Sequence, residues 1–257
     1  SKFGTPIEKG AAIRFIGEII NTPNIKLHGV HCHIGSQIFE LEPFRHTANI
    51  MLNFLANIRD KYEVTLTELN LGGGFGIKYV EGDDPVDYDQ YIKSVAGVLK
   101  DACEKRSFPL PFVYMEPGRS LVGATGTTLY TAGSVKTIEG IRTYVSIDGG
   151  MTDNPRYALY GSSYEVVCAN KYGKQRDMKA TIAGRCCESG DLIQENVMLP
   201  ACEAGDIIAV FSTGAYNYSM ASNYNRVPRP EVVFISGGSA RTVIRRETYE
   251  DITSLDV

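Results

Sequence analysis

The stretch that decides the fold reads LTELNLGGGFG and covers residues 66–76. Its first part is a short, mainly apolar run with the length and composition of a buried strand. Glycines follow at once, and without a Cβ their backbone can turn sharply or come close to another group. Glycine-rich loops of this kind gather at the carboxyl ends of parallel strands. The stretch therefore predicts one strand of a parallel sheet and a loop at its functional edge.

Two further strands with loops of unusual composition flank this stretch. Residues 26–33 (KLHGVHCH) lead into the loop HIGSQ, and residues 112–115 (FVYM) lead into EPGRS at residues 116–120. Apolar side chains at helical spacing predict a helix before each of the three strands: residues 8–21, 41–60 and 87–105. The resulting order α-β-α-β-α-β predicts parallel strands joined by right-handed crossovers, as in a (β/α)8 barrel or a doubly wound sheet.

After about residue 126 the chain changes to short β-prone runs separated by turns. These runs are residues 127–138, 142–148, 163–170, 179–184, 206–212, 231–236 and 242–246. They predict an antiparallel β domain. We therefore divide the chain into a partial barrel-like or open-sheet domain over residues 1–125 and a carboxyl-terminal β domain over residues 126–257.

Composition narrows the class of partner and the compartment. A net charge of -4 provides no broad basic surface, so we expect neither nucleic acid nor membrane as a partner and favour a small molecule. The six cysteines form no C-x-x-C pair, which favours reduced thiols over a disulfide framework. There is no long apolar run, and the first residues do not resemble a signal peptide. The sequence predicts a cytoplasmic protein.

The loop HCHIGSQ carries the first candidate site residues. His31 and His33 are two apart on a strand and share a face, yet no other His or Cys cluster has ligand spacing, so we expect no metal site. The flat imidazole of His33 beside the Ser36 hydroxyl suits stacking on a planar cofactor and binding of its phosphate. The alternative is an ordinary strand histidine with its hydrogen bonds satisfied.

The loops GGGFG and EPGRS add groups suited to a phosphate and a pyridine ring. Gly73 and Gly74 expose backbone N–H groups that can cradle a phosphate, although a tight turn explains the glycines equally well. Glu116 could keep a pyridine nitrogen protonated, and Gly118 at a new helix start could receive phosphate. A surface ion pair between Glu116 and Arg119 is the alternative for this loop.

The β domain contributes candidate substrate-binding residues. Arg156 and Tyr160 are four apart and would share a face of a helix, where a guanidinium beside a phenol can bind a carboxylate. Cys187 lies next to Glu188 in CCESGD, and Tyr216 lies in GAYNYSM. Taken by itself, Cys187 would be read as an inert core thiol.

Six motifs occur in a fixed order: HCHIGSQ, GGGFG, EPGR, NPRYALY, CESGD and GAYNYSMASNYN. Together they resemble the diaminopimelate decarboxylases of the fold-type III, alanine-racemase-like group. Arg156 and Glu188 favour this branch over ornithine and arginine decarboxylases. The resemblance implies the carboxyl-terminal part of a pyridoxal-phosphate-binding (β/α)8 barrel followed by an antiparallel β domain. It also implies decarboxylation of meso-diaminopimelate to L-lysine and CO2, the last step of lysine biosynthesis.

The same resemblance assigns roles to matching residues. It implies that His33 stacks on the ring of pyridoxal 5′-phosphate, that Glu116 pairs with the ring nitrogen and that Cys187 is a general acid from the second subunit of a homodimer with shared active sites. The remaining groups would bind phosphate or the amino-acid substrate, with Arg156 on the distal carboxylate and Glu188 on the distal ammonium. They are Ser36, Gly73, Gly74, Gly118, Arg119, Arg156, Tyr160, Glu188 and Tyr216.

One group that this resemblance implies is missing. The family holds its cofactor through a lysine in a pattern like Y-A-x-K-A, and no lysine of this sequence has that context. Only three parallel strands precede the β domain, whereas a barrel needs about eight. We therefore expect the carboxyl-terminal part of a larger enzyme, and an isolated chain that neither folds well nor decarboxylates.

Three other functions stay open on the sequence. The nearest is another fold-type III decarboxylase, acting on ornithine, arginine or carboxynorspermidine. A second is a catalytically inactive homologue that serves as an interaction module, which the missing lysine favours. A third is a phosphate-binding barrel lyase without a cofactor, which would leave Glu116 and Arg156 without a role.

Overall fold

The computed structural model describes residues 2–257, which form two compact units. Unit 1 comprises the residues through Ile77 together with Asp84–Leu121, and unit 2 comprises Lys78–Asp83 and Val122–Val257. The predicted division after residue 125 lies close to the end of unit 1. Among the described residues, no helix combines the length and the apolar character needed to cross a bilayer.

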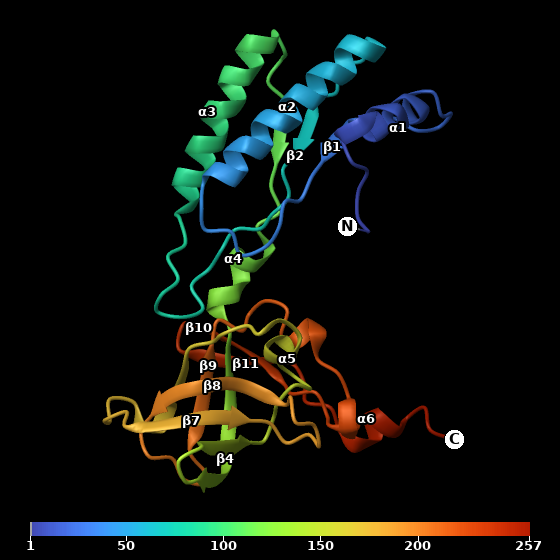
Figure 1. The fold of residues 1–257 in the computed structure, drawn as a ribbon. Helices are drawn as coiled ribbons and strands as arrows, with labels where there is room; N and C mark the ends of the chain where they lie inside the picture. The colour runs from blue at the N-terminus through green and yellow to red at the C-terminus, as the bar shows by residue number, and fades with distance from the viewer. Residues whose placement is uncertain (1) are drawn as a thin grey trace. The chain divides into compact units, whose positions relative to one another are not determined.

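Unit 1 contains a parallel sheet of three strands in the order β1-β2-β3 (Figure 1). The strands are β1 (Gly29–His31), β2 (Glu68–Asn70) and β3 (Phe112–Tyr114), and both neighbouring pairs run parallel. The helices that precede and connect them are α1 (Ala11–Ile20), α2 (Glu42–Tyr62) and α3 (Tyr88–Arg106). The predicted alternation of helices and parallel strands is therefore confirmed.

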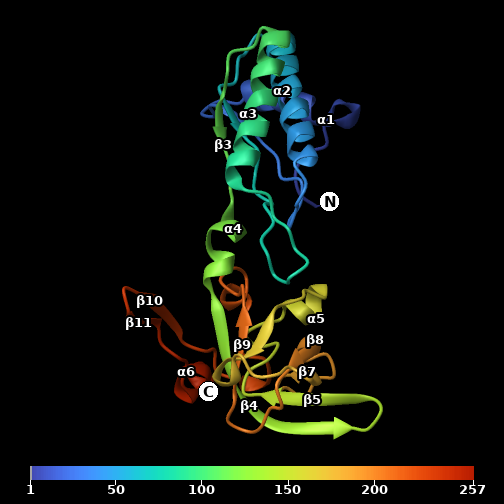
Figure 2. The ribbon, with the colours of Figure 1, turned by 90° about the vertical axis from the view of Figure 1, so that its left-hand side faces the viewer.

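Helices α2 and α3 lie side by side next to the sheet (Figure 2). Leu52 and Leu55 of α2, Leu69 of β2 and Leu99 of α3 are almost fully buried in one cluster. Each such side chain contributes about 1.5–3 kcal/mol through removal of apolar surface from water. This core holds β2 in position between its neighbouring strands. It therefore also determines where the glycine loop after β2 begins.

Unit 2 contains a sheet of six strands in the order β6-β9-β4-β5-β7-β8. Strand β4 pairs with β9 through its first half and with β5 through its second half. All pairs are antiparallel except β5 and β7, which are separated in the chain by a long crossover. The strands are β4 (Thr127–Ile138), β5 (Arg142–Ile147), β6 (Val166–Cys168), β7 (Met178–Ala183), β8 (Leu192–Leu199) and β9 (Ile207–Phe211).

Strand β8 is the one sheet strand that the sequence pattern does not predict. Its centre is polar, and Asn196 has a φ of 58°, which breaks the regular alternation. The polar side chains have tertiary partners: Gln194 accepts a hydrogen bond from the Tyr164 N–H, and Glu195 pairs with Arg142. Because those partners are distant in sequence, the local composition conceals the strand.

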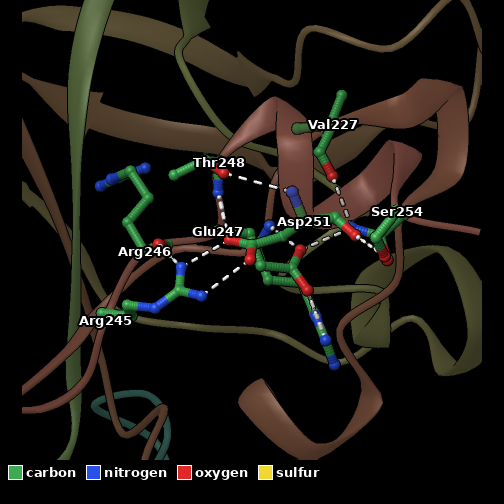
Figure 3. A network of polar contacts seen from close by, with 9 residues as sticks. Val227, Arg245, Arg246, Glu247, Thr248, Asp251 and Ser254 are labelled. Carbon is green, nitrogen blue, oxygen red and sulfur yellow. Dashed lines mark hydrogen bonds and ion pairs between the residues drawn. The ribbon is translucent and has the colours of Figure 1, made fainter.

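The last part of the chain forms the hairpin of β10 (Val232–Ser236) and β11 (Ser239–Ile244), followed by helix α6 (Tyr249–Thr253). Thr248 and Asp251 form a capping box at the start of α6, and Arg245 pairs with Asp251 (Figure 3). Glu247 accepts hydrogen bonds from the backbone N–H and the Nε of Arg229, at 2.8 and 2.7 Å. These contacts tie the segment after β11 to the segment before β10.

We expect Glu247→Gln to weaken unit 2 in a pH-dependent way. Hydrogen bonds from the Arg229 side chain lower the pKa of Glu247 from 4.5 to about 2. A lowered pKa contributes stability above the ordinary value, and this contribution is lost as the pH falls from about 4.5 through about 2. Urea unfolding should show a loss of about 1–2 kcal/mol at neutral pH and a much smaller loss near pH 2.

The exposed Glu231 provides the matched control, because Glu231→Gln makes the same chemical change at a carboxylate that does not pair with Arg229. A Glu247→Gln variant as stable as wild type at neutral pH, or equally weakened at every pH, would contradict the ion-pair explanation.

Candidate functional site

Three loops meet at the carboxyl edge of the sheet in unit 1, and main-chain hydrogen bonds join them. The Glu116 N–H donates to the Gly72 carbonyl at 2.7 Å, and the Ile38 N–H donates to the Gly74 carbonyl at 2.9 Å. The strands beneath are in register, since Cys32 N–H donates to the Asn70 carbonyl at 3.0 Å. The predicted loops HIGSQ, GGGFG and EPGRS are thus brought together.

The glycines of the middle loop are required by this close backbone approach. A Cβ on Gly72 would lie 2.4 Å from the Cys32 carbonyl oxygen, and one on Gly73 would lie 2.1 Å from the Glu116 carbonyl oxygen. Gly74, with a φ of 99°, would place its Cβ 2.4 Å from the Gly35 carbonyl oxygen. The space beside each glycine is filled by the neighbouring loop, so no side chain other than hydrogen fits there.

His33 and Glu116 are held by partners from this middle loop and from β2. The Gly73 N–H donates to Nδ1 of His33 at 3.4 Å, so the middle loop contacts one edge of the imidazole ring. Oε1 of Glu116 accepts a hydrogen bond from Nδ2 of Asn70 at 2.8 Å, and Nε2 of His31 lies 3.6 Å from the same oxygen. Asn70 is not among the residues that the sequence predicts, although a polar residue inside the apolar run LTELNL was a signal for it.

Ser36 and Arg119 come together from the first and third loops. Nη2 of Arg119 donates to Oγ of Ser36 at 2.8 Å, and Arg119 lies in the short helix α4 (Gly118–Val122). The Gly118 N–H donates to the Glu116 carbonyl at 2.8 Å, which closes a tight turn before the helix. A guanidinium beside a hydroxyl is a combination that binds phosphate oxygens.

Arg156 is the centre of a second group of predicted residues, in unit 2. It begins the helix α5 (Arg156–Tyr160), so Tyr160 lies one turn further on, as the spacing required. Its guanidinium carbon lies 5.6 Å from the ring centre of Tyr160 and 5.2 Å from that of Tyr216. Nε donates to the Tyr164 hydroxyl at 3.0 Å and Nη2 to Oγ of Ser162 at 3.2 Å.

The charge of Arg156 is not neutralised within the described part of the chain. Only 8% of the residue is exposed, and no carboxylate among residues 2–257 pairs with it. Nearby, the Tyr164 hydroxyl donates to Oδ1 of Asn217, whose Nδ2 is buried and has no partner among the same residues. A buried cation with an unused amide donor close by is an incomplete site that an anion would complete.

Tyr216 lies in a strained and anchored loop. Its φ is 70°, a left-handed conformation that a bulky residue adopts only when its surroundings impose it. The loop is fastened by the Gly214 N–H, which donates to the Gly123 carbonyl at 3.0 Å. The predicted Tyr216 is therefore held in place beside Arg156 by backbone contacts.

Cys187 and Glu188 are exposed on the loop between β7 and β8. This loop is anchored through Asp191, a buried acid that accepts hydrogen bonds from the Met151 N–H at 2.6 Å and the Cys186 N–H at 2.7 Å. Asp191 therefore has a structural role as the anchor of this loop. Cys187 and Glu188, in contrast, are exposed on its surface.

Another cluster of unit 2 has the composition of a metal site. One ligand atom each of Cys168, Cys202 and Asp206 lies within 4.8 Å of the others. The Asp206 carboxylate already forms an ion pair with the Lys171 ammonium at 2.8 Å and accepts a hydrogen bond from Nδ2 of Asn170 at 2.8 Å. The carboxylate is thus part of a buried ion-pair network.

A hollow of about 380 Å³ in unit 2 lies apart from the predicted residues. Its lining includes Tyr130, Asp153, Arg185 and Glu247. Tyr130 and Asp153 share a buried hydrogen bond, and burial raises the pKa of Asp153. None of the residues predicted to bind cofactor or substrate lines this hollow.

Comparison with protein-family models gives two overlapping matches. Residues 1–123 match the pyridoxal binding domain of pyridoxal-dependent decarboxylases, and residues 76–214 match the carboxyl-terminal sheet domain of the same family.

Curated relatives and solved structures agree with these models. The chain is 49% identical over 257 residues to a diaminopimelate decarboxylase of Bacillus subtilis, covering 100% of the chain and 58% of the relative. It superposes on M. jannaschii diaminopimelate decarboxylase in co-complex with L-lysine with a TM-score of 0.92 and 31% identity, over 100% of this chain and 58% of that one. For the Helicobacter pylori enzyme complexed with L-lysine the TM-score is 0.84 and the identity 26%, over 95% and 58%.

Proposed function

Because the chain belongs to the pyridoxal-dependent decarboxylases, we propose that the whole protein decarboxylates meso-diaminopimelate to L-lysine and CO2. Relatives that match the entire chain are named diaminopimelate decarboxylase, and two similar structures hold L-lysine. The chain spans 58% of the length of the Bacillus subtilis relative, so the reaction is proposed for the whole protein.

The observation that carries the choice of substrate is the buried, unneutralised guanidinium of Arg156. An amino acid with a single carboxylate uses that group at the reacting centre. It has no second carboxylate that could pair with the guanidinium of Arg156. meso-Diaminopimelate has a second ammonium-carboxylate centre, whose carboxylate can accept from Arg156. A substrate lacking that group leaves the buried charge unpaired, which is costly and gives strong discrimination.

The loops of unit 1 have the groups that pyridoxal 5′-phosphate needs. Ser36 and Arg119 provide a hydroxyl and a cation 2.8 Å apart for the phosphate, with Gly74 as a backbone donor, whereas the Gly118 N–H is used by the Glu116 carbonyl and Gly118 only shapes the turn. Gly73 orients the imidazole of His33, which can stack on the pyridine ring. When bound, the cofactor supplies an electron sink for the carbanion formed as CO2 leaves. Glu116 keeps the ring nitrogen protonated, which sustains that sink.

The exposed loop of Cys187 and Glu188 fits a role in a second copy of the protein. We assign the protein a homodimer in which this loop reaches the partner's site. Glu188 then binds the distal ammonium, and the Cys187 thiol donates a proton to the substrate carbon. All six cysteines of the described residues are unpaired, which supports a reducing compartment such as the cytoplasm.

Substrate profiling tests this function. The whole protein with pyridoxal 5′-phosphate is incubated separately with meso-diaminopimelate, lysine, ornithine, arginine and carboxynorspermidine, and the products are followed by mass spectrometry. We expect kcat/KM for meso-diaminopimelate to exceed the others by roughly 10⁴-fold, because the others leave Arg156 unpaired. Equal or better turnover of ornithine or arginine would overturn the assignment.

A further inference from the structure

We propose that Asn70 is a positioning residue, which fixes one oxygen of the Glu116 carboxylate and leaves its second oxygen for the pyridine nitrogen. This inference rests on the cofactor role of Glu116 proposed above. Asn70 is the last residue of β2, and Glu116 follows β3, so the contact joins two neighbouring strand ends in unit 1.

The orientation of the Asn70 amide follows from its partners. The Gly72 N–H can only donate, and it lies 2.8 Å from Oδ1 of Asn70, so this oxygen is the acceptor. Nδ2 must then face the other way, towards Oε1 of Glu116 at 2.8 Å. An amide N–H can only donate, so Oε1 of Glu116 is the acceptor of this bond.

The two oxygens of Glu116 are unequal as a result. Nδ2 of Asn70 and Nε2 of His31 both approach Oε1, at 2.8 and 3.6 Å. Oε2 has no hydrogen-bond or ion-pair partner in the described part of the chain. A carboxylate fixed through one oxygen presents the other in a defined direction, which is what pairing with a ring nitrogen requires.

An isosteric variant separates this role from simple packing. Asn70→Asp keeps the shape and the acceptor for the Gly72 N–H, but replaces the amide N–H with a second carboxyl oxygen against Glu116. Two carboxyl oxygens at hydrogen-bond distance need a shared proton. While protonated, the introduced carboxyl donates as the amide did, and once ionised it repels Glu116.

We therefore expect a pH signature in the whole protein loaded with pyridoxal 5′-phosphate. The ratio of kcat for Asn70→Asp to kcat for wild type should fall roughly tenfold between about pH 5.5 and pH 8.5, the cost of one lost charged hydrogen bond. Asn70→Ala, which lacks the donor at every pH, should show a lower and flat ratio. Asn49→Asp on the exposed face of α2 is the charge control and should follow wild type.

A spectroscopic measurement gives the same answer without turnover. With cofactor labelled with 15N in its ring, the bound nitrogen should report a protonated pyridine in wild type. In Asn70→Asp, it should report an unprotonated one as the pH rises. His33 lies on an adjoining loop and Arg119 in α4, and Nε2 of His31 lies 3.6 Å from Oε1 of Glu116, so the series is repeated with His31→Gln to remove that imidazole.

The outcomes separate this inference from the function on which it rests. If wild type binds no cofactor or releases no CO2, the proposed function fails. If wild type is active while Asn70→Asp follows it at every pH in both measurements, the positioning role of Asn70 is overturned.

Discussion

Replacing Arg156 with alanine should abolish the preference for meso-diaminopimelate and lower kcat/KM by roughly 10²–10⁴-fold. The guanidinium is buried between tyrosine rings, with no carboxylate partner among residues 2–257. The contact proposed with the distal carboxylate would therefore be made in a site of low dielectric, where losing one partner leaves the other unpaired. Steady-state kinetics of the whole protein with meso-diaminopimelate and lysine would measure both the rate and the selectivity.

Two further variants make this result specific. Arg156→Lys keeps the positive charge but loses the planar guanidinium that can form two parallel hydrogen bonds with a carboxylate. Its kcat/KM and its substrate selectivity should lie between those of wild type and Arg156→Ala. Arg176→Ala removes an exposed arginine of the same unit and should leave both values unchanged. If Arg156→Ala retains its structure and an unaltered substrate preference, Arg156 does not bind the distal carboxylate.

Glu116→Gln should lower kcat by roughly 10²–10³-fold while the cofactor still binds. The change removes the negative charge that we propose keeps the ring nitrogen protonated, and it leaves in place Ser36 and Arg119, the residues proposed to bind the phosphate. Cofactor content measured by absorbance, together with kcat for meso-diaminopimelate, would separate a chemical defect from a binding defect.

Glu68 offers the control on the neighbouring strand, where its carboxylate lies 3.6 Å from Nδ1 of His28. Glu68→Gln makes the same substitution away from the loops and should keep the activity of wild type. A Glu116→Gln enzyme within about threefold of wild type would show that the ring nitrogen does not depend on this acid.

Much of the fold could be predicted because its signals are local. The apolar spacing in residues 41–60 predicts α2, since the same side chains that define the spacing form the buried face. The helical spacing between Arg156 and Tyr160 predicts their contact for the same reason. Strand β8 was missed because its polar residues are matched by Tyr164 and Arg142, which lie far away in sequence.

The site was harder to predict where contacts join separate loops. The glycines of GGGFG suggested a phosphate cradle or a turn, whereas the structure shows that Gly72 and Gly73 allow three backbones to touch. Asn70 has only the weak signal of a polar residue inside an apolar run, and Asn217 has no distinctive local pattern. The importance of both follows from partners on other elements. A sequence motif identifies the reacting groups more readily than the residues that orient them.

The main-chain contacts between the loops also bear on how this site could be redesigned. The spacing of His33, Ser36 and Glu116 is determined by peptide groups, through bonds such as Glu116 N–H to the Gly72 carbonyl at 2.7 Å. Peptide groups do not change when a side chain is exchanged. Each of the three side chains can therefore be replaced separately while the others keep their positions. This edge of the sheet is thus suited to stepwise substitution when a new cofactor chemistry is to be engineered.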